Sequence, residues 1–140
     1  MNRATKLSVL ADDFPDAEVE YEDLLSLPYG PDRRAADGAI DCFGIVLDVY
    51  RRAGLGLPDP AKAGLAILDF QELFEEVPAI ERLYDMADLR TTQHHLMVAV
   101  RSGLLLSARL KVGVYTMPTK RLIGRAGVTY WRLRDAALPI

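Results

Sequence analysis

The segment from Asp41 to Ala53 constrains the fold of this 140-residue chain more than any other part of it. Its apolar residues recur at positions 42, 45, 46, 49, 50 and 53, which is the spacing of one buried face of a helix. Asp41 is a favourable N-cap residue, and Gly54 follows where helices commonly end. The pattern therefore predicts an amphipathic helix whose first residue is the only cysteine of the chain, Cys42.

After residue 93 the pattern changes from that of helices to that of strands. Four short segments are rich in valine, leucine and aromatic residues, and turn residues separate three of them. These segments span residues 94–100, 104–109, 111–117 and 127–133. Helices followed by an antiparallel meander predict an α+β fold, with N-terminal helices packed on an antiparallel sheet of about 4–6 strands.

The other segments carry weaker patterns. The patterns predict an irregular arm over 1–15, a helix over 16–27, a loop over 28–38 and a second helix over 61–76, whereas 81–92 fits neither type. The total length is that of one compact core, so we expect a single domain over residues 1–140.

Composition argues against several classes of partner and site. The net charge is -3 and the chain has no block of lysine and arginine, so we expect no nucleic-acid binding. No segment is long and apolar enough to span a membrane, and no cysteine–histidine cluster suggests a metal, so we expect no membrane partner, metal or cofactor. The N-terminal segment lacks the apolar core of a signal peptide, and we expect synthesis in the cytoplasm.

Cys42 admits two interpretations. Free cysteines are usually buried and inert, and this one lies on the apolar face of its predicted helix. The first turn of a helix, however, has unpaired N–H groups and a dipole that favour a reactive thiolate. A nucleophilic thiol needs a base, and His94 and His95 are the only histidines in the chain. Spacing alone does not separate the two histidines, so either could be the base. Alternatively, both are solvent-exposed residues at the end of a strand.

Three segments, in this order, resemble the NlpC/P60 family of cysteine peptidases. Asp41-Cys42-Phe43-Gly44 and the apolar helix after it are similar to the family's nucleophile motif. Pro28-Tyr29-Gly30 stands where the family has a Pro-Tyr or similar pair upstream of the cysteine. Residues 95–100 resemble the strand that begins with the family's base, and this alignment favours His95 over His94.

The resemblance implies a papain-like domain that hydrolyses amide bonds in the stem peptide of peptidoglycan without a cofactor. Cys42 would be the nucleophile, held as a thiolate by His95 and the helix start. Ser107 would stand in the place of the residue that orients the base. The substrate side would be lined by Tyr29, Asp41 and Phe43.

Domains of this family also occur in the tail tips of long-tailed phages, where they open the cell wall or serve as structural plugs. A cell-wall hydrolase without a signal peptide can be delivered by a virion. We therefore expect a phage tail-tip component whose partners are the stem peptide and other tail-tip or hub proteins.

The sequence departs from the family pattern at three places. Ser107 stands where the family has histidine, and Phe43 stands where it has serine. Residues 58–93 match the family poorly, and 84–93 lack the glycine–aspartate turn that, with an extra strand, precedes the family's base, so we expect that part to be remodelled or lost. These departures favour an alternative, a catalytically degenerate NlpC/P60-like structural module of the tail tip. A papain-like amidase or acyltransferase of small cytoplasmic amides is a further alternative.

The position of Ser107 relative to His95 depends on the hairpin between their two strands. Strand alternation places His95 on the face of Met97 and opposite Leu96. A hairpin loop of three or five residues would bring Ser107 to the His95 face, whereas a loop of two residues would place it on the other face.

Overall fold

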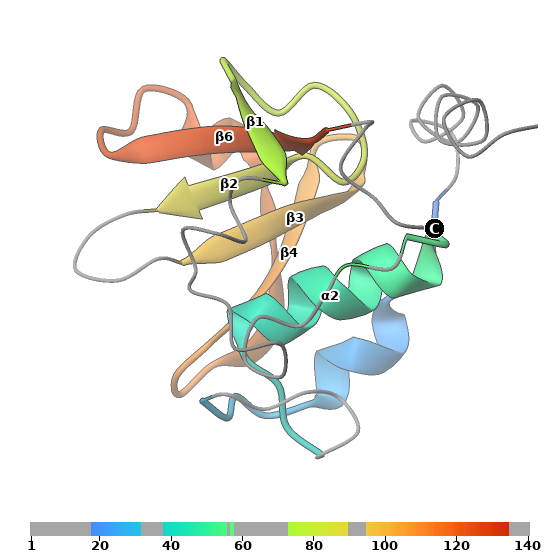
Figure 1. The fold of residues 1–140 in the computed structure, drawn as a ribbon. Coiled ribbons are helices and arrows are strands. Elements are labelled where there is room, and N and C mark those ends of the chain that lie inside the picture. Colours follow the sequence, from blue (N-terminus) through green and yellow to red (C-terminus); the bar gives the residue numbers. More distant parts are fainter. Residues whose placement is uncertain (1–17, 32–37, 56, 58–72, 90–94, 135–140) are drawn as a thin grey trace, which may run out of the picture.

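The computed structural model describes residues 18–31, 38–55, 57, 73–89 and 95–134. These residues contain one α-helix, two short 3-10 helices and six strands (Figure 1). The helices are η2 (Glu22–Ser26), α2 (Cys42–Arg52) and η4 (Thr119–Leu122). The strands are β1 (Phe74–Val77), β2 (Met86–Leu89), β3 (Leu96–Arg101), β4 (Leu104–Arg109), β5 (Gly113–Pro118) and β6 (Val128–Leu133).

The six strands form one antiparallel sheet in the order β1-β6-β2-β3-β4-β5. Strands β3, β4 and β5 follow one another as predicted, and β2 comes before them from the segment that fits neither type. The fourth predicted strand, β6, does not continue the meander, because it returns across the molecule to lie between β1 and β2. Helix α2 packs on one face of the sheet, against β3 and β4 (Figure 1). The predicted α+β fold, a helix on an antiparallel sheet, is confirmed.

Helix α2 forms where the sequence predicts it, and a side chain caps its start. The Asp41 carboxylate accepts a hydrogen bond of 2.7 Å from the backbone N–H of Gly44, which satisfies one of the open donors of the first turn. Four apolar residues on its inner face are buried in the main core: Ile45, Val46, Val49 and Tyr50. Cap and packing together hold Cys42 at the first residue of the helix.

The helix predicted over 61–76 is wrong at its C-terminal end, where the chain forms strand β1. Phe74 pairs with Leu133 of β6 and buries its ring in the main core. Pairing with a distant strand therefore outweighs the local helical spacing. Residues 58–72, which hold most of the predicted helix, lie outside the described residues.

The helix predicted over 16–27 is reduced to the single 3-10 element η2 within the described residues. Its start has no side-chain cap, and Leu24 is the only residue of η2 that is buried. Too little apolar surface packs here to support a longer α-helix. The arm predicted over 1–15 lies outside the described residues.

A strand precedes His95 although the sequence lacks the glycine-containing turn expected there. Tyr84 takes the left-handed conformation, with φ of 71°, that a glycine would otherwise supply. The Asp85 carboxylate holds this turn by accepting hydrogen bonds of 3.0 and 3.1 Å from the N–H groups of Glu81 and Arg82. The chain then enters β2, so of the two outcomes expected the strand is not lost and the turn before it is remodelled.

Candidate active site

Cys42 is half-buried at the start of α2, where it packs against the core between helix and sheet. Burial raises the pKa of the thiol above its ordinary value, and the negative charge of Asp41 adds to the rise. The sulfur also lies beside the backbone N–H of Leu96, which favours the thiolate but does not offset burial. At rest Cys42 is therefore a neutral thiol near pH 7, not the thiolate expected at a helix start.

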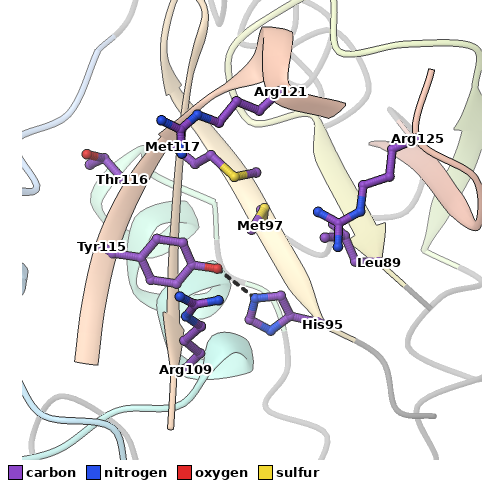
Figure 2. A pocket seen from close by; sticks show the side chains of 9 residues that line it. All are labelled: Leu89, His95, Met97, Arg109, Tyr115, Thr116, Met117, Arg121 and Arg125. Atoms are coloured by element: carbon purple, nitrogen blue, oxygen red, sulfur yellow. Dashed lines mark hydrogen bonds between the residues drawn. The ribbon is translucent and has the colours of Figure 1, made fainter. Parts of the chain in front are cut away.

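His95 immediately precedes β3, next to the residue whose N–H meets the Cys42 sulfur. Its Nε2 atom lies 2.8 Å from the hydroxyl oxygen of Tyr115 on β5, and the two rings are nearly parallel (Figure 2). Burial lowers the pKa of His95, and the positive charge of Arg109 lowers it further. His95 is therefore neutral near pH 7, in the form that accepts a proton.

Ser107 reaches the His95 face of the sheet through a β-bulge. The β3–β4 turn has two residues, which alone would place Ser107 on the opposite face. A register shift between Ala99 and Arg101 inserts one more residue into β3. The bulge turns Ser107 to the same face as His95, directly across from Tyr115.

A chain of polar contacts links His95 to the backbone through Tyr115 and Ser107. The Ser107 hydroxyl donates a hydrogen bond of 2.7 Å to the carbonyl oxygen of Leu96, and it also meets the Tyr115 hydroxyl. Because a carbonyl only accepts, Ser107 uses its one hydrogen there. In the 2.8 Å contact between His95 and Tyr115, either the ring nitrogen or the hydroxyl can donate. If the ring donates from Nε2–H, its basic lone pair lies on Nδ1.

The comparisons with known proteins bear on the fold. No protein-family model matches this chain, and no curated protein matches it in sequence. Among solved structures, the chain is similar to a Staphylococcus aureus protein described as similar to lipoprotein, NLP/P60 family, with a TM-score of 0.51 and 17% identity. The likeness covers 89% of this chain and 41% of that protein. This chain has the fold of an NlpC/P60 domain.

In this NlpC/P60-like domain the loop before α2 brings Tyr29 near the candidate nucleophile. Tyr29 forms a parallel bridge with Ile40, two residues before Cys42. Phe43 is partly buried against the main core, and Asp41 caps the helix. The three residues expected on the substrate side thus gather around the helix start, and their contact with a substrate stays a prediction.

Tyr115 is the residue of the candidate site that sequence reasoning missed. The resemblance directed attention to Ser107 as the partner of the base, whereas the His95 ring is hydrogen-bonded to Tyr115. The signal lay in the β4–β5 hairpin, whose register places Tyr115 directly across from Ser107. His94, the other candidate base, lies outside the described residues.

No group of three or more histidine, cysteine, aspartate or glutamate side chains among the described residues is suited to hold a metal ion. No helix in the part of the chain that the structure describes is long and apolar enough to cross a membrane.

Proposed function

We propose that this NlpC/P60-like domain is a cysteine peptidase of peptidoglycan stem peptides, with Cys42 as nucleophile and His95 as base. The observation that carries the proposal is the position of the Cys42 sulfur at the helix start, beside the N–H of the residue that follows His95. The neutral state of His95 also supports it, because a general base must begin unprotonated. The fold supports the choice of substrate class.

Both groups are neutral at rest, which favours general-base catalysis over a preformed ion pair. In this mechanism Nδ1 of His95 accepts the thiol proton as the Cys42 sulfur bonds to the amide carbonyl carbon. Backbone N–H groups at the start of α2 bind the oxyanion of the tetrahedral intermediate. His95 then gives the proton to the leaving amine as the C–N bond breaks. Water hydrolyses the remaining thioester and restores the thiol.

Tyr115 is a positioning residue in this proposal. The mechanism requires that its hydroxyl accept from the Nε2–H of His95 at their 2.8 Å contact, which fixes the ring and keeps the lone pair on Nδ1. The Ser107 hydroxyl contacts the Tyr115 hydroxyl and so helps to hold it in place. The task that the resemblance assigns to one histidine is thus divided between a tyrosine and a serine.

Purified sacculi test the activity. The wild-type chain is expected to release soluble muropeptides, and Cys42→Ala and His95→Gln are each expected to lower the initial rate by about a thousandfold or more. His94→Gln is the matched control, because it removes the neighbouring histidine and should leave the rate unchanged. Equal rates for wild type and Cys42→Ala would exclude Cys42 as the nucleophile. Loss of activity in His94→Gln alone would assign the base to His94.

The setting that we propose is the tail tip of a phage or phage-like particle, with other tail-tip or hub proteins as partners. The occurrence of domains of this family in such tips supports it. Mass spectrometry of purified particles is expected to find the chain in the tail fraction. Its absence from intact particles of the producing phage would contradict this setting.

One observation favours a second function, that of a catalytically degenerate structural module in the same particle. The pKa of the Cys42 thiol is raised and that of His95 is lowered, so both groups are shifted away from a reactive ion pair. The sacculus assay separates the two functions. If wild type and Cys42→Ala are equally inert and equally incorporated into particles, the structural function holds.

A further inference from the structure

A pocket of about 370 Å³ lies beside His95, on the face of the sheet opposite α2 (Figure 2). Three apolar side chains, those of Leu89, Met97 and Met117, line part of it, and the His95–Tyr115 pair forms one side. Its volume falls within the range of about 300–1,000 Å³ that is common for small-ligand sites. The pocket is therefore large enough for a small organic molecule.

Three arginines from three different elements surround this pocket (Figure 2). Arg109 ends β4, Arg121 belongs to η4, and Arg125 lies in the turn before β6. All three side chains are exposed, and no carboxylate of the described residues forms an ion pair with any of them. The whole chain has a net charge of -3, so this local excess of positive charge does not follow from composition.

Two of the three guanidinium groups, those of Arg109 and Arg125, act on the polar residues of the pocket. Arg109 lies over the ring of Tyr115, 5.3 Å from its centroid. Burial lowers the pKa of His95, and the charges of Arg109 and then Arg125 lower it further, with Asp88 opposing them. A neutral histidine, with three arginines that form no ion pair with the described residues, makes the pocket attractive to negative charge.

We propose that this pocket binds an organic anion that carries two or more carboxylate or phosphate groups on a partly apolar body. Guanidinium groups bind both kinds of oxyanion through paired N–H donors. More than one negative charge is needed to balance three arginines, and the methionines provide contacts for the apolar part. Binding requires neither the Cys42 thiol nor hydrolysis, so the inference is independent of the proposed peptidase activity.

Calorimetric titration of the full chain at low ionic strength tests the proposal, with citrate and pyrophosphate as probes and acetate as the single-charge control. One saturable site is expected for citrate or pyrophosphate, with affinity at least about tenfold higher than for acetate. Tighter binding of citrate would identify carboxylates as the preferred groups, and tighter binding of pyrophosphate would identify phosphates. If neither binds more tightly than acetate, the proposal is overturned.

The double variant Arg121→Gln/Arg125→Gln is expected to weaken binding of the better probe by about tenfold or more. Lys111→Gln/Lys120→Gln is the matched control, because it removes the same two charges from exposed residues that do not line the pocket. It should weaken binding by less than about twofold. If the arginine and lysine variants weaken probe binding equally, the effect is general charge attraction and the proposed site is refuted.

A second readout locates the ligand. In His94→Gln only His95 titrates as a histidine, so its NMR signal reports on the pocket directly. A bound anion offsets the arginine charges, and the pKa of His95 is therefore expected to rise when the probe is saturating. An unchanged pKa would place the anion elsewhere and refute the proposal. Cys42→Ala should bind the probe as the wild type does. A wild-type chain that binds the anion but releases no muropeptides would count against the peptidase proposal only.

Discussion

Asp41 acts on the residue after it in two opposing ways. Its carboxylate caps α2 and so holds Cys42 at the first helical residue, where N–H groups favour a thiolate. The same negative charge adds to the effect of burial and raises the pKa of the thiol. The two effects are separable, because asparagine caps a helix about as well as aspartate but carries no charge.

We therefore expect Asp41→Asn to keep the fold and lower the pKa of Cys42. Alkylation by iodoacetamide follows the thiolate, so the raised pKa predicts a slow rate at about pH 7 that rises with pH beyond the free-thiol value of about 8.5. In Asp41→Asn the profile should move to lower pH, with a roughly two- to fivefold faster rate at about pH 7.5.

Glu75→Gln is the control for this alkylation experiment, because it removes an exposed carboxylate on β1 that does not contribute to the pKa of Cys42. Its profile should match that of the wild type. A wild-type profile centred below about pH 7 would mean that a thiolate exists at rest and would contradict the neutral pair inferred here.

At the scale of elements, local periodicity predicts the parts that carry the site. Helix α2 follows from apolar spacing and an N-cap, both of which lie within a few residues of one another. Strand β4 spans the predicted residues 104–109, because turn residues mark its start and apolar residues fill it. These two elements place Cys42 and Ser107 in the fold.

The connections between elements could not be predicted in the same way. The bulge between Ala99 and Arg101 depends on how β3 pairs with β4, and the left-handed Tyr84 is held by contacts of the folded turn. Neither feature has a local sequence signal. The rule that a two-residue hairpin loop places Ser107 on the face opposite His95 therefore gives the wrong face. The partnership of Tyr115 with His95 is hidden for the same reason, since it requires the register of three strands.

Gly113 is the point where the loop that carries Tyr29 meets strand β5. Its φ is 81°, and a Cβ atom there would lie 2.9 Å from the carbonyl oxygen of Leu27. We expect Gly113→Ala to lower the free energy of unfolding by roughly 2–4 kcal/mol, through left-handed strain and a clash with backbone. Urea unfolding measures the loss.

Gly124→Ala separates the two causes. Gly124 has φ of 75°, but a Cβ atom there would meet nothing within 4 Å. The expected loss is the left-handed strain alone, about 1–2 kcal/mol. If both variants lose the same stability, the contact between Gly113 and Leu27 is not tight and the loop is held to β5 by other groups.

Over the whole molecule, one buried ion pair ties the last strand to the strand that leads to His95. Two hydrogen bonds of 2.8 Å join Arg132 on β6 to Asp85, from Nε to Oδ1 and from Nη2 to Oδ2. The Asp85 side chain is 1% exposed and that of Arg132 17%. At the other end of β2, the N–H of Leu89 donates a hydrogen bond of 3.0 Å to the carbonyl oxygen of His95. Strand β6, inserted between β1 and β2, thus holds β2 in place, and β2 in turn holds the backbone of His95.

Removing the cation from this pair should therefore cost far more than removing one at the surface. Arg132→Gln is expected to lower the free energy of unfolding by about 3–5 kcal/mol, because a buried carboxylate loses its charge partner. Arg51→Gln is the control, since the Arg51 side chain is 69% exposed and its partner Asp48 keeps Arg52. Its loss should not exceed about 1 kcal/mol in urea unfolding.

The double variant Asp85→Asn/Arg132→Gln shows how much of that loss comes from leaving the buried Asp85 carboxylate without a charge partner. It leaves no ion at this position, and the asparagine oxygen can still accept from the N–H groups of Glu81 and Arg82. We expect it to be more stable than Arg132→Gln alone. If the double variant is no more stable, the loss comes from the missing guanidinium hydrogen bonds, and β6 is held by their geometry rather than by charge.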